Sequence, residues 1–280
     1  MRDVPYIADP PVAGIPTQQE ASALFARMTV APSAARKALI NETIYRLKQA
    51  GVWANLVTLA VHAAHDEQAG LLCWKNAAKN PTKTGSLTFT ADLGFTAGWS
   101  GANYLEYPLT TAGDFASAAP NTCWFLAAGD YDAATVSASA AQYAIISAAG
   151  AVFPDTDDGL VMATLDVALG TASRGFAIGY SEAPPFSQGV AGGLSRDFTV
   201  ATGRPGVVAT AYAGGCLINP VYTESITLDA PSTINAPRTC DKALGDHAAF
   251  GAMLPAATAA HAKALGVIMS DYLYRLGAFA

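Results

Sequence analysis

Short apolar stretches separated by turn residues run through most of this 280-residue chain, and this pattern restricts its fold more than any other feature. In residues 57–61 the apolar Val57, Leu59 and Val61 alternate with Thr and Ala, which is typical of a strand with one buried face. The same reasoning predicts further strands at Ser86–Thr90, Tyr104–Leu109, Cys123–Ala127, Gln142–Ser147, Leu160–Leu165, Gly175–Tyr180, Val207–Tyr212 and Ser225–Asp229.

Glycine-rich or aspartate-rich breaks separate these stretches, at residues 98–101, 129–130, 155–159 and 192–193. An alternating α/β fold needs a helix between most pairs of strands, and none of these gaps carries a helical pattern. We therefore predict a mainly-β fold, an antiparallel β-sandwich of jelly-roll type.

Two amphipathic helices bracket the predicted strands. The first begins after the N-cap Ser33, repeats apolar residues at positions 40, 44 and 47, and ends at Gly51. The second follows Pro255 and ends near Gly277, with one apolar stripe formed by His261, Leu265, Ile268, Tyr272 and Leu276. The proline-rich residues 1–32 are predicted to form an extended N-terminal arm, and residues 33–280 the helix-bracketed jelly-roll domain.

Composition excludes several classes of protein. The chain is 51% hydrophobic and 14% charged, so it is not a disordered polymer. Its net charge is −6 and no Lys/Arg cluster is present, which argues against nucleic-acid binding. Apolar runs are interrupted by polar residues and the N-terminus lacks a signal-peptide core, so we expect no membrane insertion and synthesis in the cytoplasm.

The four cysteines, Cys73, Cys123, Cys216 and Cys240, are widely spaced and have no C-x-x-C pair. Three disulfide pairings are open to them. We favour reduced, buried packing residues, because Cys73 and Cys123 each precede a tryptophan within an apolar run.

The region from residue 35 to residue 96 has a distinctive order of motifs. The first helix leads to Gly-Val-Trp at 51–53, then Val-His-Ala-Ala-His-Asp-Glu-Gln-Ala at 61–69 and Leu-Cys-Trp-Lys-Asn at 72–76, followed by Leu-Thr-Phe-Thr-Ala-Asp-Leu-Gly-Phe-Thr at 87–96. This order resembles a family of phage and prophage structural proteins, found in tailed phages and gene-transfer-agent-like particles, with a concanavalin A/laminin G-like jelly roll. The resemblance covers residues 33–110 and the final helix.

The resemblance implies a virion component, assembled in the host cytoplasm, such as a head spike, tail fibre or tail-tip protein that contacts host surface polysaccharide. Other virion proteins and further copies of the same chain are the implied partners. Within the matching motifs, Asp92 is expected to form a turn and Phe89 and Phe95 to lie in the core. Residues 97–101 read Ala-Gly-Trp-Ser-Gly where the family more often has Asp between glycines, which argues against an acidic metal site there.

Catalytic motifs are incomplete. The Gly-x-Ser steps at Ser100, Ser181 and Ser195 all lack the second glycine of a nucleophile elbow. His62 and His65 form H-x-x-H rather than H-E-x-x-H, and the strand prediction places them on opposite faces. Several carboxylates qualify by type as a pair for glycoside cleavage, and the sequence selects none of them. We therefore predict that the chain is not an enzyme.

Residues 155–159 are the best candidates for calcium binding, because Asp155, Asp157 and Asp158 gather carboxylates on one turn. Glycine is fifth in this loop rather than sixth as in an EF-hand, and Asx-turns explain the same residues. No other cofactor is indicated.

Aromatic residues in the loops favour binding of carbohydrate. Trp99, Tyr104 and Tyr131 lie in or beside predicted loops, and Asn103 lies close to Trp99. Aromatic rings stack on the apolar faces of sugars, while neighbouring polar groups bind the hydroxyls; closing the sandwich is the alternative role for these rings. We predict glycan attachment, with capsid decoration or a tail adaptor as the second hypothesis and a glycan depolymerase as the third.

Overall fold

The computed structural model describes residues 14–99, 102–114, 125–130, 146–147, 160–166, 174–180, 194–198, 207–212, 215–218, 222–224, 238–239, 246–254 and 256–278. These residues form antiparallel sheets flanked by helices. The jelly-roll arrangement of the strands stays a prediction. No helix in these ranges is long and apolar enough to cross a membrane.

The helices of the described chain lie within residues 19–114 and 259–276. They are α1 (Gln19–Phe25), α2 (Ala34–Gln49), α3 (Val52–Asn55), α4 (Glu67–Gly70), the 3₁₀ turn η1 (Ala77–Lys79), α5 (Thr111–Asp114) and α6 (Ala259–Leu276). The predicted boundaries of α2 and α6 are confirmed: the Ser33 hydroxyl caps α2 by accepting from the Arg36 amide, and Gly277 ends α6 at φ 85°.

Part of the segment predicted as an extended arm is helical. Helix α1 lies within residues 1–32 and buries Ala21 and Leu24 in the core cluster that also contains α2. Its seven residues form only two turns, and their order depends on this packing rather than on a sequence repeat. Residues 1–13 of the predicted arm lie outside the described residues.

The largest sheet has eight strands in the order β13-β12-β11-β6-β15-β4-β3, with β1 also paired to β15. Its strands are β1 (Leu56–Val61), β3 (Thr88–Thr90), β4 (Gly94–Ala97), β6 (Phe125–Asp130), β11 (Val207–Tyr212), β12 (Gly215–Ile218), β13 (Tyr222–Glu224) and β15 (Asp246–Met253). Strands β1 and β4 share one edge of β15: β1 pairs with residues 249–253, whereas β4 pairs at His247.

Two smaller antiparallel sheets complete the described strands. One has the order β2-β5-β14-β7 and the other β10-β9-β8. Their strands are β2 (Thr82–Thr84), β5 (Tyr104–Glu106), β7 (Ile146–Ser147), β8 (Leu160–Asp166), β9 (Arg174–Tyr180), β10 (Leu194–Phe198) and β14 (Arg238–Thr239). The predicted strand at 207–212 is exact, those near 88, 104, 125, 146, 160 and 174 are confirmed with shifted ends, and that at 225–229 lies outside the described residues.

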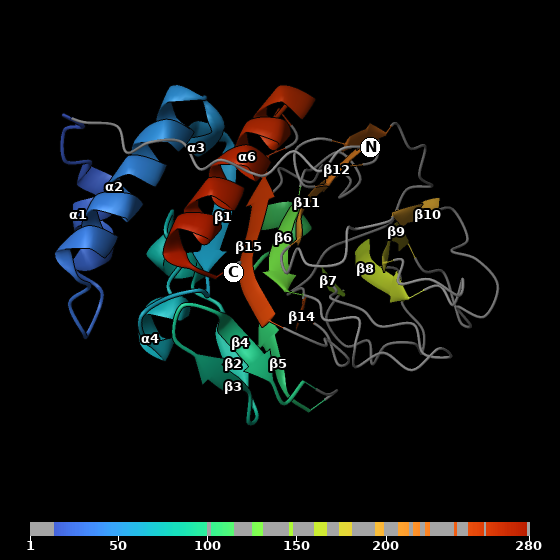
Figure 1. The fold of residues 1–280 in the computed structure, drawn as a ribbon, viewed down its shortest axis with the longest axis horizontal. Helices are drawn as coiled ribbons and strands as arrows, with labels where there is room; N and C mark the ends of the chain where they lie inside the picture. The colour runs from blue at the N-terminus through green and yellow to red at the C-terminus, as the bar shows by residue number, and fades with distance from the viewer. Residues whose placement is uncertain are drawn as a thin grey trace.

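The large sheet separates two packed regions. On one face, Leu59 and Val61 of β1 join helices α2, α3 and α6 in a single apolar cluster, and these helices lie together beside β1 and β15 (Figure 1). On the other face, the Phe250 ring of β15 packs at 4.0 Å, centroid to centroid, on Tyr107, which follows β5. Strand alternation therefore separates the helix-facing residues from those that face β5.

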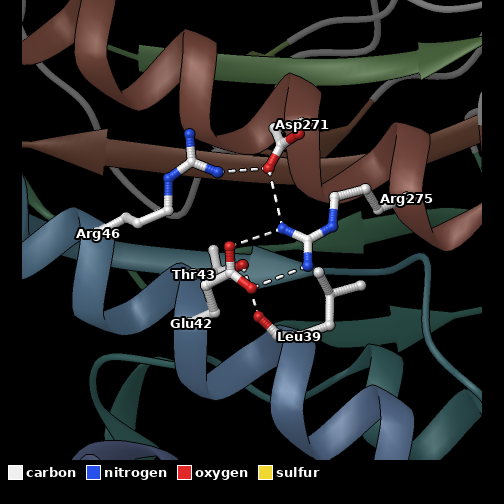
Figure 2. A network of polar contacts seen from close by, with 6 residues as sticks. All are labelled: Leu39, Glu42, Thr43, Arg46, Asp271 and Arg275. Atoms are coloured by element: carbon white, nitrogen blue, oxygen red, sulfur yellow. Dashed lines mark hydrogen bonds and ion pairs between the residues drawn. The ribbon is translucent and has the colours of Figure 1, made fainter. Parts of the chain in front are cut away.

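Four charged side chains join α2 to α6 inside this helical layer (Figure 2). Arg275 binds Glu42 through both guanidinium Nη atoms, at 2.7 and 2.8 Å. Asp271 accepts hydrogen bonds from Arg275 and from Arg46. The Asp271 and Glu42 side chains are only 2% and 6% exposed, and each faces a guanidinium group. Because charges and hydrogen bonds are matched, this cluster fixes the two helices relative to each other.

Candidate functional site

Two loops meet at one end of the β2–β5 pair. Thr84, the last residue of β2, is the register partner of Tyr104, the first residue of β5. Asn103 joins the loops: its side-chain oxygen accepts from the Ser86 amide at 2.9 Å, and its nitrogen donates to the Gly98 carbonyl at 2.8 Å. We call this region, Thr84–Ser86 with Gly98, Trp99, Asn103 and Tyr104, the loop rim.

Glycine is required at two positions of the loop rim. Gly85 has φ 73°, and a Cβ there would lie 1.9 Å from the Asn103 oxygen. Gly98 has φ 89°, and its Cβ would lie 2.5 Å from the Ser86 carbonyl oxygen. Both contacts are shorter than any real Cβ allows, and both backbones are left-handed. The close approach of the loops therefore depends on these two glycines.

Trp99 packs against a series of aromatic side chains. Its ring meets Phe95 edge-on at 6.4 Å between centroids, and Phe95 meets Phe89 at 5.5 Å and His62 at 5.6 Å, also edge-on. Phe95 is fully buried, as the resemblance implies, whereas Phe89, also expected in the core, is part-exposed, and so is Trp99. Edge-on packing of this kind fixes ring orientation. Trp99 is therefore supported by the core while it reaches the surface.

His62 is the buried polar group beneath this series. Its Nδ1 lies 2.7 Å from the Gly70 carbonyl and its Nε2 lies 2.8 Å from the Tyr107 hydroxyl. Since a carbonyl can only accept, Nδ1 carries the proton and Nε2 accepts from Tyr107. Burial lowers the pKa of His62 to about 4, because the charged ring would lose its hydration. His62 is thus a neutral part of the core.

The other histidine of the H-x-x-H motif has different surroundings. His65 is part-exposed, and its Nε2 lies 2.9 Å from the Val30 carbonyl and 3.1 Å from a carboxylate oxygen of Asp66. Within the described residues, no group of three His, Cys, Asp or Glu side chains could hold a metal ion. Cys73 is a buried free thiol, as predicted; the other cysteine side chains lie outside the described part.

Three of the predicted ligand residues come together, and their roles differ. Trp99, Asn103 and Tyr104 all belong to the loop rim and are part-exposed. Both polar atoms of the Asn103 amide hold backbone groups, so this side chain shapes the rim. Tyr131 and the calcium candidates Asp155, Asp157 and Asp158 lie outside the described residues.

Other contributors to the rim were missed by sequence reasoning. Ser86 and Thr84 are exposed beside Asn103, and Gly85 allows their close approach. The Thr-Gly-Ser order at 84–86 is itself a turn signal that can be read from the sequence. Its pairing with residues 98–103 depends on contacts between segments distant in sequence, which the local pattern does not contain.

The loop rim combines the two kinds of group that a sugar requires. Trp99 and Tyr104 are part-exposed aromatic residues, and Thr84 and Ser86 are exposed residues that carry hydroxyl groups. Such rings can stack on the apolar face of a sugar, while hydroxyls and backbone groups exchange hydrogen bonds with its hydroxyls. The arrangement is chemically suited to holding carbohydrate.

No protein-family model and no curated protein matches the chain. Among solved structures it is similar to a mutant of Trypanosoma rangeli sialidase displaying trans-sialidase activity, at 10% identity and a TM-score of 0.44. It is also similar to the Trypanosoma rangeli sialidase in complex with a difluorinated nononic acid, at 13% identity and a TM-score of 0.41. These matches cover 86% and 84% of this chain but 40% and 39% of the sialidase chains, so it spans well under half of their length.

The prediction that the chain is not an enzyme is contradicted, because the solved chains that it matches are enzymes that process carbohydrate. That prediction depended on incomplete short motifs, and catalytic groups brought together from distant strands leave no such motif. With TM-scores below 0.5, the likeness assigns no shared fold, substrate or catalytic residue to this chain. Neither of the two matched chains is a phage protein.

Proposed function

We propose that the chain binds carbohydrate at the loop rim. The observation that carries the proposal is the placement of Trp99, a part-exposed residue whose ring packs edge-on against the buried Phe95. A ring already fixed in place loses little conformational entropy when a sugar stacks on it. The Asn103 amide adds to this order by fixing both loops through backbone hydrogen bonds.

The biological setting that we propose follows from the resemblance of residues 33–110 to phage and prophage structural proteins. In this setting the chain is a spike, fibre or tail-tip component of a phage-like particle, and the loop rim attaches the particle to host surface polysaccharide. Other particle proteins and further copies of the chain are its proposed partners. A structural adaptor without a ligand and a glycan depolymerase are the competing hypotheses.

The direct test is binding of the full chain to an array of bacterial surface polysaccharides, followed by calorimetry with each glycan retained. Trp99→Ala is expected to weaken binding about tenfold, because it removes the stacking ring and the apolar area that it buries. Tyr45→Ala is the matched control, since Tyr45 is a part-exposed aromatic residue on helix α2. Thermal melting of both variants verifies that they fold.

The competing hypotheses give different results in the same experiment. If no glycan is retained and the chain assembles only with particle proteins, the adaptor hypothesis is favoured and the proposal fails. If new reducing ends appear when wild-type chain is incubated with a retained glycan, the chain cleaves what it binds. Equal loss of affinity in Trp99→Ala and Tyr45→Ala would place the glycan away from the loop rim.

A further inference from the structure

The outer face of the β2–β5 pair continues the loop rim along the strands. Thr82 and Thr84 of β2 stand opposite Glu106 and Tyr104 of β5, so these four side chains point to the same side. Both threonines are exposed and the other two residues are part-exposed, whereas Leu105 between them is fully buried on the opposite side. Residues two apart in a strand are separated by about 7 Å. Thr82 and Glu106 therefore add a second pair of polar side chains at that distance from Thr84 and Tyr104.

Charges beside this face are already matched. Lys83 pairs with Glu67 at 2.5 Å, and Lys79 pairs with Asp114 at 2.5 Å. In the strand register, Arg238 of β14 is the backbone partner of Glu106. The four described side chains of the outer face, Thr82, Thr84, Tyr104 and Glu106, include one acid and no base, so they offer an anionic ligand no positive charge.

We propose that the loop rim and this outer face together bind an uncharged oligosaccharide, in preference to an acidic one. This inference rests on the proposed carbohydrate-binding function and specifies its ligand class. An anionic sugar would lose hydration here without gaining an unmatched cation, and it would lie close to the Glu106 carboxylate. The hydroxyls of a neutral sugar match the threonine and tyrosine hydroxyls in both donor and acceptor roles.

The experiment compares neutral hexasaccharides of glucose, galactose and mannose with hexagalacturonate, using calorimetry on the full chain at low and high salt. The wild-type chain is expected to bind a neutral hexasaccharide more tightly than hexagalacturonate, with an affinity that salt leaves unchanged. It is also expected to bind the hexasaccharide more tightly than the matching monosaccharide, because only the longer ligand reaches the outer face.

A charge introduced on the face gives the sharper test. Thr84→Lys is expected to raise the affinity for hexagalacturonate about threefold, and to do so only at low salt. Ala38→Lys, on an exposed position of α2, adds the same charge elsewhere and is expected to leave the affinity unchanged.

Two outcomes would overturn the inference in distinguishable ways. If the wild-type chain prefers hexagalacturonate with salt-dependent affinity, and Trp99→Ala still removes binding, the ligand class is wrong while the carbohydrate site stands. If no hexasaccharide and no array glycan binds, the proposed function itself fails and this inference fails with it.

Discussion

The Tyr107 hydroxyl donates a hydrogen bond to Nε2 of His62 across 2.8 Å, in the buried space between the large sheet and β5. On the far side of the same ring, the Gly70 carbonyl accepts from Nδ1. This contact couples three parts of the chain: the residue after β1, the residue after β5 and the end of α4. It lies under Phe95, so the support of Trp99 depends on it.

Tyr107→Phe tests this coupling. The variant keeps the ring that packs on Phe250 but removes the donor to His62, leaving a buried nitrogen with one partner fewer. We expect the free energy of unfolding to fall by about 1–3 kcal/mol, measured by urea denaturation. Tyr45→Phe, on the part-exposed face of α2, serves as the control and should stay within about 0.5 kcal/mol of wild type. Equal stabilities for the two variants would contradict a structural role for the bond.

His62 also predicts how stability depends on pH. Its pKa is about 4 in the folded chain, below the ordinary value of 6.5, so the unfolded chain binds more protons between these values. The stabilising contribution is complete above pH 6.5 and is lost as pH falls toward 4. A difference of this size corresponds to about 3 kcal/mol at most. Urea denaturation across this range should show a shallower pH dependence for His62→Gln than for wild type; identical slopes would exclude His62 as the cause.

Glu42→Gln tests the charged cluster between α2 and α6 (Figure 2). The change removes a carboxylate that binds both Nη atoms of Arg275 and raises the pKa of that guanidinium through its hydrogen bonds. Because the side chains are 6% and 17% exposed, we expect a loss of about 3 kcal/mol of unfolding free energy. Glu20→Gln is the matched control, since the exposed Glu20–Lys48 pair contributes at most about 1 kcal/mol. Similar losses in both variants would show that burial of the pair is unimportant.

The parts of the fold that the sequence predicts are those with local causes. Helix α2 has its N-cap Ser33 and the left-handed Gly51 at its two ends, and both signals can be read in the sequence. Asp92, expected to form a turn, has φ 68° between β3 and β4. For such residues, local chemistry and the final structure agree.

The central strand was missed because its cause is not local. Strand β15 reads Asp-His-Ala-Ala-Phe-Gly-Ala-Met and has no β-branched residue. It is a strand because β1 and β6 pair with it on both sides, and small residues suit this crowded position: a Cβ on Gly251 would lie 3.3 Å from Leu59. The loop rim was predicted incompletely for the same reason. Trp99 and Asn103 are close in sequence and could be linked, but the hydrogen bond from the Ser86 amide to Asn103 joins segments that are distant in sequence.

Gly98→Ala tests whether glycan binding depends on the geometry of the loop rim. The change alters the backbone of the loop but removes no side chain that would contact a glycan. The added methyl would lie 2.5 Å from the Ser86 carbonyl oxygen in a left-handed backbone, so the loop must move away from Ser86 and break the Asn103 hydrogen bond to Gly98. Gly14→Ala is the matched control: φ there is 75°, and nothing lies within 4 Å of the added Cβ. Both variants carry the backbone strain, about 1 kcal/mol, but only Gly98→Ala should also weaken glycan binding, measured by calorimetry. Unchanged affinity in Gly98→Ala would show that the rim's geometry is not what positions Trp99.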